Sequence, residues 1–505
     1  MSDVLFGQSY YLRFDPKLWK ARQPYPPLGT LYAASYLREK GYDVAFFDAM
    51  LSDSEKEWVE ALDAHQPQYA VIYEDNFNYL SKMCLLRMRQ AAFNMSEMAK
   101  AKGCTVIVCG SDATDHASEY FDHGVDYVLL GEGEITLGEL MDHLTSGSPK
   151  NKEDILGLAW NTQNGKLQQT TMRPVIKELD ELPFPAWDLV DIPRYKKIWQ
   201  EHHGYYSMNL VTTRGCPYHC NWCAKPIWGQ RYNVRSPENV VEEMLWIKHT
   251  HQPDHVWFAD DIMGLKPGWI QEFAKLVEKN DAVIPFKSLN RADLLLMGDT
   301  IDALRRAGAR TVWIGAESGS QKILDAMEKG TTVEQIYEVT WRLHGAGIQV
   351  AFFLQFGYPG ETREDIELTL KMVRDCQPDD IGISVSYPLP GTTFYERVKA
   401  EFGEKQNWQD SEDLAMLYHG PYTTEFYRKL HAVVHKEFRK RKFLGEISNV
   451  IRSPNNLQKQ HVRRFAAALY YQLSLPLERH KLNQLAKAPH EPTVTSGLNR
   501  EIFQI

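Results

Sequence analysis

Residues 213–223 read TRGCPYHCNWC and place three cysteines within eight residues of one another. The segment follows an apolar run, residues 207–212, that is typical of a β-strand. Gly215 would let the backbone turn sharply as it leaves that strand. Thiolates at the spacing Cys-x3-Cys-x2-Cys can hold three irons of a [4Fe–4S] cube, because soft sulfur ligands suit iron–sulfur clusters. We therefore expect Cys216, Cys220 and Cys223 to bind such a cluster and to leave its fourth iron open to a small molecule.

A zinc site is the alternative interpretation of this loop. Structural zinc is usually closed by four ligands, and no fourth Cys or His follows at zinc-finger spacing. His219 lies between two of the cysteines and is poorly placed to be that ligand. An odd total of seven cysteines in 505 residues argues against a disulfide framework. The remaining cysteines are scattered and are predicted to be inert buried thiols: Cys84, Cys104, Cys109 and Cys376.

The cysteine segment belongs to a series of six predicted strands that are separated by helical stretches. Six βα units that close only part of a circle predict a partial (β/α)6 barrel over residues 206–400. The chemistry of such a barrel lies at the carboxyl ends of its strands. The predicted strands are residues 207–212, 255–258, 286–289, 311–315, 350–356 and 381–387.

Polar residues stand at those carboxyl ends. Asp260 and Asp261 follow the second strand, and buried paired carboxylates need a substrate, a cofactor or a basic partner. A helix N-cap is the alternative role for Asp261. Asn290 and Arg291 follow the third strand, where the arginine fork would suit a carboxylate or ribose unless the pair is a surface loop. Tyr387 ends the sixth strand and is expected to line a substrate cavity.

Residues 1–148 alternate short apolar runs with helical stretches in the same way. Strands are predicted at residues 44–47, 69–73, 105–108 and 126–130, which favours a doubly wound parallel sheet. Ligands of such sheets sit outside the carboxyl ends of the strands. Residues 149–205 are expected to be a linker with a short hairpin that turns at Asn164-Gly165. The predicted fold class is therefore α/β, with a Rossmann-like domain before the barrel.

The last part of the chain, residues 401–505, is predicted to be helical and basic. Residues 421–505 hold 15 Lys and Arg against 6 Asp and Glu, a net charge of +9, so the preceding residues carry −18. Residues 460–472 are expected to form an amphipathic helix. A solvated helical surface is the simpler interpretation, and the alternative is peripheral contact with a membrane or an anionic substrate.

Composition limits the possible classes of protein. Hydrophobic residues make up 43% and charged residues 24%, which excludes collagen-like and wholly disordered chains. The net charge of −9 argues against a general nucleic-acid-binding surface. No apolar run reaches about 18 residues, and the first residues lack the pattern of a signal peptide. We expect a cytoplasmic protein.

The cysteine segment resembles the defining motif of the radical S-adenosylmethionine enzymes, Cys-x3-Cys-x-aromatic-Cys, with Trp222 as the aromatic residue. The resemblance continues over about 190 residues and includes residues 315–319 (GAESG), similar to the family's Gly-x-Glu-Ser-Gly segment. In that family the open iron chelates S-adenosylmethionine, and an electron from the cluster cleaves it to a 5′-deoxyadenosyl radical. The resemblance implies S-adenosylmethionine contacts at Trp222, Asn290, Arg291, Glu317, Ser318 and Gln355, and catalytic roles for Asp260, Asp261 and Tyr387.

The N-terminal part resembles the cobalamin-binding domains that are joined to such barrels. The likeness rests on residues 26–29 (PPLG), 109–112 (CGSD) and 126–134 (DYVLLGEGE), and residues 73–78 are the candidate loop beneath the corrin. The Asp-x-His-x-x-Gly ligand motif is absent, because Gln68 stands where its glycine would be, so no cobalt-ligating histidine is predicted. A flavodoxin-like domain kept for packing is the alternative. The resemblance implies cobalamin contacts at Pro27, Leu28, Gly29, Tyr73, Asn76, Gly110, Ser111, Asp112, Gly131, Glu132 and Gly133.

Together the two resemblances point to the group that contains hopanoid and bacteriochlorophyll methylases and the anaerobic magnesium-protoporphyrin ester cyclase. The first hypothesis is C-methylation of an unactivated carbon of a small-molecule or lipid-like substrate, with methylcobalamin and the 5′-deoxyadenosyl radical. The second keeps both cofactors but gives oxidative cyclisation or rearrangement. The third is a non-catalytic iron–sulfur or zinc protein. An electron donor such as flavodoxin or ferredoxin is an implied partner, and nucleic acid is not.

Overall fold

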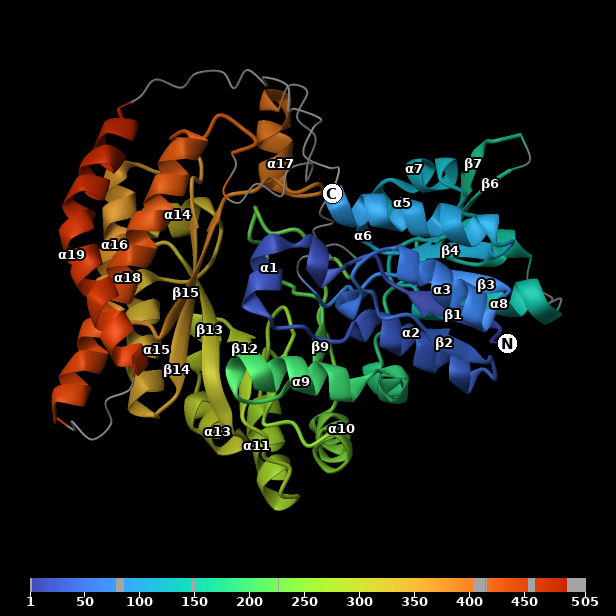
Figure 1. Cartoon of the computed structure of the whole chain (residues 1–505), viewed down its shortest axis with the longest axis horizontal. Coiled ribbons are helices and arrows are strands. Elements are labelled where there is room, and N and C mark those ends of the chain that lie inside the picture. The colour runs from blue at the N-terminus through green and yellow to red at the C-terminus, as the bar shows by residue number, and fades with distance from the viewer. Residues whose placement is uncertain are drawn as a thin grey trace.

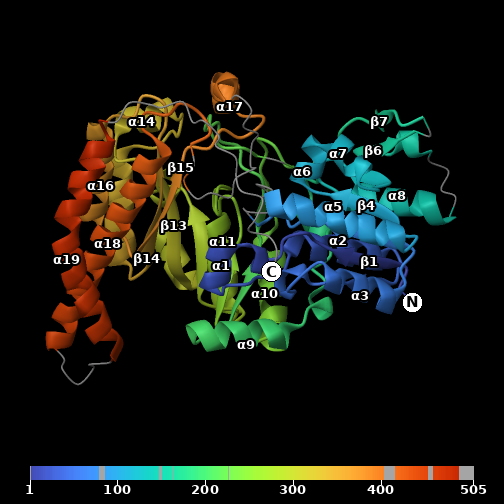
Figure 2. The ribbon, with the colours of Figure 1, turned by 45° about the horizontal axis from the view of Figure 1, so that its top comes forward.

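The computed structural model describes residues 2–78, 86–146, 151–162, 164–225, 227–402, 414, 416–452 and 459–487. Two sheets lie beside each other, the N-terminal one on the right of Figure 1 and the second nearer its centre. Two long helices, α18 (Thr424–Arg452) and α19 (Lys459–Leu485), flank the second sheet on the side away from the first (Figures 1 and 2). Cys84, which the sequence predicts to be an inert thiol, lies outside the described residues.

Five parallel strands form most of the first sheet, and helices cover both of its faces. The sequence predicts every one of these strands except the first, a four-residue run that is buried throughout and shows no alternation. Helices α3 (Lys56–His65) and α5 (Leu86–Ala101) pack on one face, and α2 (Leu28–Glu39) and α8 (Glu134–Ser146) on the other. In sheet order the strands are β2 (Val44–Phe46), β1 (Val4–Gly7), β3 (Tyr69–Tyr73), β4 (Thr105–Cys109) and β5 (Tyr127–Leu129).

The same sheet continues into residues 149–205, which the sequence predicts to be a linker. β6 (Leu158–Asn161) pairs antiparallel with β5, and β7 (Leu167–Gln169) pairs with β6. Leu158, Ala159 and Trp160 are buried, so the hairpin is part of the first sheet and not a free connection. Farther along, α9 (Ile192–His203) buries Tyr195 and Trp199 in the same core as the second sheet.

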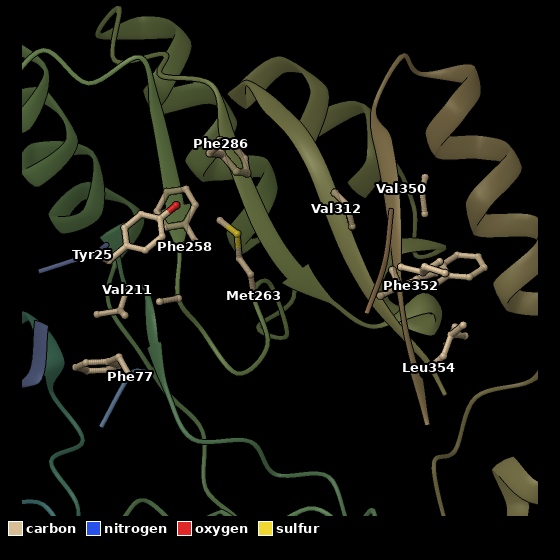
Figure 3. Close-up of a cluster of buried hydrophobic side chains, with 14 of the residues drawn as sticks. Tyr25, Phe77, Val211, Phe258, Met263, Phe286, Val312, Val350, Phe352 and Leu354 are labelled. Atoms are coloured by element: carbon tan, nitrogen blue, oxygen red, sulfur yellow. The ribbon is translucent and has the colours of Figure 1, made fainter. Parts of the chain in front are cut away.

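Six parallel strands form the second sheet, and all six predicted strands are confirmed. The sheet is open between its two edge strands, as in a partial barrel. Helices cover its convex face, where Phe258, Phe286, Val312, Val350 and Phe352 belong to the core seen in Figure 3. In sheet order the strands are β15 (Asp380–Val385), β14 (Gln349–Phe356), β13 (Ala309–Glu317), β12 (Phe286–Asn290), β11 (His255–Phe258) and β8 (Ser207–Leu210). The covering helices include α10 (Pro237–Thr250), α11 (Trp269–Lys279), α13 (Thr300–Ala307), α15 (Val333–Gly345) and α16 (Arg363–Cys376).

The predicted helical C-terminal region is the pair α18 and α19, and the helix expected over residues 460–472 lies within α19. Ala468, Leu475 and Leu482 are buried at intervals of seven residues, so α19 packs along a narrow seam, as helices of coiled coils do. Val462, Phe465, Leu469, Leu473 and Leu477 remain exposed on α19. None of the described helices is long and apolar enough to cross a membrane.

A two-stranded antiparallel stem, β9 (Thr213–Arg214) with β10 (Asn233–Val234), joins the barrel to the first domain. Arg214 is buried and binds two carboxylates of the loop and helix after β5, Glu132 at 2.5 Å and Glu134 at 2.8 Å. Its guanidinium also lies 5.4 Å from the ring centroids of both Tyr32 and Phe77. A guanidinium held by two carboxylates and two rings from another domain fixes the position of the stem against that domain.

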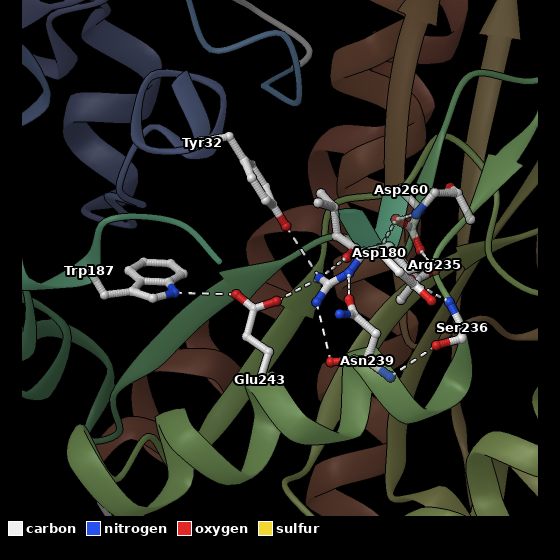
Figure 4. A network of polar contacts seen from close by, with 11 residues as sticks. Tyr32, Asp180, Trp187, Arg235, Ser236, Asn239, Glu243 and Asp260 are labelled. Atoms are coloured by element: carbon white, nitrogen blue, oxygen red, sulfur yellow. Dashed lines mark hydrogen bonds and ion pairs between the residues drawn. The ribbon is translucent and has the colours of Figure 1, made fainter. Parts of the chain in front are cut away.

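Arg235, directly after β10, makes a second buried junction (Figure 4). It donates to Glu243 of α10 at 2.5 Å and to the hydroxyl oxygen of Tyr32 of α2 at 3.2 Å. Trp187, from the segment between the two sheets, donates its indole N–H to the same Glu243 at 3.2 Å. Both ends of the stem are therefore tied to the first domain or to its connection.

Arg214→Met should lower the free energy of unfolding by about 3–5 kcal/mol, because Glu132 and Glu134 would stay buried without a counter-charge. Urea denaturation of the purified chain measures the loss. The matched control is Arg305→Met, whose partner Asp302 is half exposed and whose loss should cost less than about 1 kcal/mol. Equal effects of the two substitutions would contradict the structural role of Arg214.

Candidate active site

The cysteine loop, residues 215–232, leaves and re-enters the barrel through the stem. Gly215 has a φ of +82°, and a Cβ at this position would lie 2.5 Å from the carbonyl oxygen of Arg231. A side chain is thus excluded where the two ends of the loop approach each other. The sharp turn expected at Gly215 is confirmed, and it lies directly after β9.

Cys216, Cys220 and Cys223 are each partly exposed on this loop. Burial raises the pKa of the Cys216 thiol and raises that of Cys223 to about 12. Both thiols are therefore protonated at neutral pH until a metal displaces their protons. No three His, Cys, Asp or Glu among the described residues converge on one ion. A cube needs no such convergence, because each thiolate binds a different iron.

Asn221 anchors the loop between the second and third cysteines. Its side-chain amide donates to the carbonyl oxygen of Ala326 at 2.9 Å and accepts from the Tyr358 hydroxyl at 2.7 Å. Ala326 ends α14 (Gln321–Ala326) and Tyr358 follows β14, so loops from two strand ends hold the cysteines in place. Sequence reasoning missed this residue, because an asparagine carries no signal of a partner 105 residues away.

Opposite charges gather next to the cysteine loop. Lys329 Nζ lies 2.8 Å from Glu317 Oε1, and Arg291 donates to the carbonyl oxygen of Lys329 at 3.0 Å. The Arg291 guanidinium also lies over the ring of Tyr218, 3.6 Å from its centroid. Glu317 has a φ of +54°, a strained conformation that clusters at functional sites. The structure thus brings two predicted residues, Arg291 and Glu317, to the cysteines and adds Lys329, to which the sequence analysis assigned no role.

Asp260, which is predicted to be catalytic, is hydrogen-bonded to the strand that leads into the stem. Its buried carboxylate accepts from the Thr212 hydroxyl and N–H, both at 2.6 Å, and from the Thr213 N–H at 2.9 Å. Burial raises its pKa to about 6. Both oxygens thus fix the strand that leads into the stem, and a catalytic role for Asp260 stays a prediction. The neighbouring Asp261 raises the pKa of Cys216 electrostatically, so it lies near the loop.

Three further predicted residues have partners within the protein. The Asn290 side chain donates to a backbone carbonyl of the preceding strand-end loop at 3.0 Å. Ser318 is fully buried and its hydroxyl lies 3.2 Å from that of Thr369. The Tyr387 hydroxyl accepts from the N–H of Leu414 at 3.1 Å. These contacts shape the strand-end loops, and contact of the three residues with a cofactor or substrate stays a prediction.

Several buried polar atoms at this end of the barrel have no hydrogen-bond partner in the described structure. They include Trp222 Nε1, Thr331 Oγ1, Gln355 Oε1 and Ser386 Oγ. Buried polar groups are normally paired, so this group fits a site whose ligand supplies the missing partners. With three thiols and a lysine–glutamate pair beside them, the donor set fits a [4Fe–4S] cluster and the amino, carboxylate and ribose groups of S-adenosylmethionine.

The loops predicted to contact cobalamin meet at the carboxyl edge of the first sheet. Gly29 N–H donates to Asp75 at 3.0 Å, and Gly133 N–H donates to the Tyr73 hydroxyl oxygen at 3.2 Å. A Cβ on Gly29 would lie 3.1 Å from the backbone nitrogen of Asn76, and one on Gly133 would lie 2.9 Å from Tyr73. These glycines therefore let the protein's own loops pack closely. The other predicted contacts at this edge are Pro27, Leu28, Gly110, Ser111 and Gly131, of which Leu28 is fully buried in the core.

Two predicted cobalamin contacts are carboxylates with partners inside the protein. Glu132 is bound by Arg214 of the stem. Asp112 accepts from Arg89 and from the Tyr120 hydroxyl, both at 2.8 Å. Both carboxylates thus have partners inside the protein, and their contact with cobalamin stays a prediction. The sequence motif identifies Glu132 as a candidate, but it does not show that Arg214, 82 residues away, is its partner.

The same edge still contains unpaired polar groups. Gln8 Oε1 and Ser9 Oγ, directly after β1, are buried and have no hydrogen-bond partner in the described part of the chain. Glu74, at the end of β3, is buried and accepts from the Ser9 N–H at 3.1 Å. Burial raises the pKa of Glu74 to about 8. Polar atoms of this kind fit a ligand rich in amide and phosphate groups, as cobalamin is.

Glu74→Gln should stabilise the apoprotein at pH 8 and have a smaller effect as the pH falls toward 5. The folded pKa of about 8 exceeds the ordinary value of 4.5. The stability contributed by wild-type Glu74 is therefore fully present below about pH 4.5 and is lost as the pH rises toward 8. The gain at pH 8 is on the order of a few kcal/mol, and urea midpoints between pH 5 and 8 measure it. Glu238→Gln, at an exposed carboxyl of α10, is the control, and a pH-independent effect of Glu74→Gln would contradict the assignment.

Family models match two parts of the chain: residues 210–373 match the radical SAM superfamily, and residues 18–141 match the B12 binding domain. An uncharacterized methyltransferase of Pyrococcus horikoshii is 27% identical over 377 residues, or 74% of this chain and 78% of that protein. The anaerobic magnesium-protoporphyrin IX monomethyl ester cyclase of Synechocystis is 25% identical over 74% of this chain and 73% of that protein. Hopanoid C-3 methylase of Methylococcus capsulatus is 26% identical over 72% of this chain and 67% of that protein.

Two solved structures share the fold. The cobalamin-dependent S-adenosylmethionine radical enzyme OxsB with aqua-cobalamin bound matches with a TM-score of 0.71 at 16% identity, over 95% of this chain and 72% of that chain. The methyltransferase TsrM from Kitasatospora setae, with cobalamin and a [4Fe–4S] cluster bound, matches with a TM-score of 0.65 at 18% identity, over 80% of this chain and 79% of that chain. With its cysteine loop facing the edge of a B12 binding domain, the chain belongs to the cobalamin-binding radical S-adenosylmethionine enzymes, whose cofactors are a [4Fe–4S] cluster, S-adenosylmethionine and cobalamin.

Proposed function

We propose that this enzyme transfers a methyl group to an unactivated carbon of a small-molecule or lipid-like substrate. The observation that carries the proposal is the junction at Arg214, which ties the start of the cysteine loop to Glu132 and Glu134 of the B12 binding domain. The two cofactor sites therefore adjoin, as a methyl donor and a hydrogen-abstracting group must if they act on one carbon. Methyltransferases among the similar proteins support this choice.

In this proposal the charged residues beside the cysteines bind S-adenosylmethionine. Arg291 and Lys329 offer donors to a carboxylate, and Glu317 offers an acceptor to an amino group. When bound, the cofactors supply a transferable methyl group and a radical able to remove hydrogen from carbon. The cluster is assigned to Cys216, Cys220 and Cys223, S-adenosylmethionine also to Trp222 and Gln355, and substrate contact to Asp261 and Tyr387.

Oxidative cyclisation is the second candidate. The observation that favours it is the similarity to the anaerobic magnesium-protoporphyrin IX monomethyl ester cyclase, which extends over 74% of this chain. The same cysteine loop and the same B12 binding domain would serve either reaction. The two candidates differ in whether the substrate gains a carbon atom.

We also propose an electron donor as partner, because reductive cleavage of S-adenosylmethionine consumes an electron. A cavity of about 520 Å³ lies beside the cysteine loop, between residues 174–177 and residues 217 and 230–233. Lys177 and Arg231 are exposed at its rim, which suits an acidic donor such as flavodoxin or ferredoxin. The unpaired thiols of Cys104, Cys109 and Cys376 suit the reducing cytoplasm. Peripheral membrane contact would involve the exposed apolar residues of α19.

Cys216→Ala, Cys220→Ala and Cys223→Ala should each abolish formation of 5′-deoxyadenosine after anaerobic reconstitution, because each removes one cluster ligand. Bound iron and the broad absorbance near roughly 400 nm should fall in parallel. The control is Cys376→Ala, which changes a buried thiol of α16 and should leave the iron content unchanged. Full activity after any one of the first three substitutions would refute the ligand assignment.

S-adenosylmethionine labelled in its methyl group should transfer the label to an organic product in step with 5′-deoxyadenosine formation. The reconstituted enzyme is incubated with cobalamin, a reductant and a small-molecule extract of cells that carry the gene, and products are separated by liquid chromatography with mass spectrometry. The Cys216→Ala protein is the matched blank. Unlabelled product that accumulates with 5′-deoxyadenosine would contradict the proposed methylation and favour cyclisation.

A further inference from the structure

The concave face of the barrel carries one row of residues that the cofactor sites do not use. The strand register aligns Asn209, Trp257, Lys287 and Thr311 across β8, β11, β12 and β13. Side chains alternate along a strand, and Phe258 and Phe286 on either side of this row pack against Phe273 of the outer helix α11. The row therefore faces the hollow side of the sheet. It lies near the amino ends of the strands, below the cysteine loop.

Lys287 is a cation without a close anionic partner in that row. Its Nζ lies 4.8 Å from the ring centroid of Trp257 and 5.3 Å from that of Tyr25. Among the described residues no carboxylate lies within ion-pair distance of it, and Asp380 of β15 acts on it only at longer range. Burial lowers the pKa of Lys287 to about 8. A partly buried ammonium held only by ring faces gains most from an anion that enters with a ligand.

Two aromatic rings lie on the same concave face, beyond this row toward the carboxyl ends of the strands. Trp313 of β13 and Phe353 of β14 lie 4.6 Å apart between ring centroids with an interplanar angle of 30°. Phe353 is 41% exposed although its strand has a neighbour on each side. Gly382 of β15 lets both rings lie close to its strand, since a Cβ there would lie only 3.2 Å from Phe353 and 3.4 Å from Trp313. The two rings form an accessible apolar surface that no described residue covers completely.

This aromatic surface reaches toward the cofactor site. Phe353 pairs in register with Gly315 of β13. A Cβ on Gly315 would lie 2.5 Å from Lys329 Nζ and 2.6 Å from Glu317 Oε1, so the charged pair beside the cysteines sits directly over this position. A molecule lying on Trp313 and Phe353 would therefore have one end near the cofactors and the other near Lys287.

The N-terminal segment closes the opposite side of the hollow. Tyr25 donates or accepts a hydrogen bond with Ser207 of β8 at 3.0 Å, and its ring lies 5.1 Å from that of Trp199 (Figure 3 shows Tyr25 beside the barrel). Asn209 donates to the carbonyl oxygen of Pro26 at 2.9 Å, and its Oδ1 is buried with no hydrogen-bond partner in the described part of the chain. The wall thus offers one free acceptor in the same row as the lysine.

We propose that the concave face binds a substrate with a flat conjugated or aromatic body that bears a carboxylate, its body on Trp313 and Phe353 and its carboxylate on Lys287. The inference names the substrate class of the proposed function and rests on it. Aromatic surfaces favour flat apolar partners, and a charge-assisted hydrogen bond fixes the direction in which the molecule lies. The carbon that reacts is then at the end of the molecule far from its carboxylate.

Binding of 2-naphthoate and of neutral 2-naphthylmethanol to the reconstituted full-length enzyme tests the proposal by isothermal titration calorimetry. The wild type should bind naphthoate more tightly than the alcohol. Lys287→Gln should weaken naphthoate binding by about tenfold to a hundredfold and leave binding of the alcohol unchanged. The alcohol thereby reports that the site of the variant is still folded. Lys275→Gln, at an exposed lysine of α11, is the matched control and should change neither affinity.

Two further variants test the aromatic surface. Trp313→Ala and Gly382→Val should weaken both probes several-fold, since the first removes a ring and the second forces a side chain against both rings and displaces them. The proposal is overturned if the wild type binds neither probe, or if Lys287→Gln affects both probes equally or neither. Failure of this proposal can be distinguished from failure of the proposed methylation, because naphthoate binding needs no methyl transfer. If the protein binds naphthoate through Lys287 but transfers no label, the substrate site is supported and the methylation is not.

Discussion

The contact of Arg214 with Glu132 and Glu134 is the constraint on which the rest of the structure depends. A buried guanidinium is tolerated only while its carboxylates hold their positions, so the two domains have one docking geometry and not a range of them. Arg214 lies in the stem, and the next residue begins the cysteine loop. The same ion pairs therefore set the position of the thiols relative to the edge of the B12 binding domain. At the other end of the stem Arg235 donates to the Tyr32 hydroxyl oxygen of that domain. Chemistry that needs two large cofactors on one carbon requires this kind of fixed spacing.

Much of the fold was predictable from local sequence, and part of the site was not. Buried parallel strands such as β11 and β14 are runs rich in apolar residues, so they are visible in the sequence. β1 is as long as β11 but is not predicted, because no helical stretch precedes it to mark the alternation of strands and helices. The cysteines were predictable because metal ligation needs particular residues at close spacing. The roles of Asp260, Glu132 and Asn221 were not, because their partners lie 48, 82 and 105 residues away along the chain. A local pattern marks which residues can do chemistry, and only the tertiary fold decides whether they meet a ligand or another side chain.

The polar residues of the site fall into two groups with different surroundings. Asp260, Asn290 and Ser318 have their hydrogen bonds satisfied within the protein and give the strand-end loops their shape. Trp222, Gln355 and Thr331 each carry a buried polar atom that is unpaired in the described structure, and these are the positions where a ligand gains most by binding. Motif resemblance treats both groups alike, because residue type does not record which hydrogen bonds are already made.

The segment around Tyr25 belongs to the first domain in sequence but forms one wall of the barrel, through its contacts with Ser207, Trp199 and Trp257. This arrangement has a consequence for biosynthesis. The segment leaves the ribosome before any barrel strand has been synthesised, so the Tyr25 ring has none of its barrel partners while the first domain folds. Residues 206–400 expressed alone would lack this wall and would leave Trp257 uncovered. The barrel strands therefore form a sheet of their own, but the barrel cannot be completed from residues 206–400 alone. Its wall also needs Tyr25 and Trp199, which lie near the two ends of the first two hundred residues.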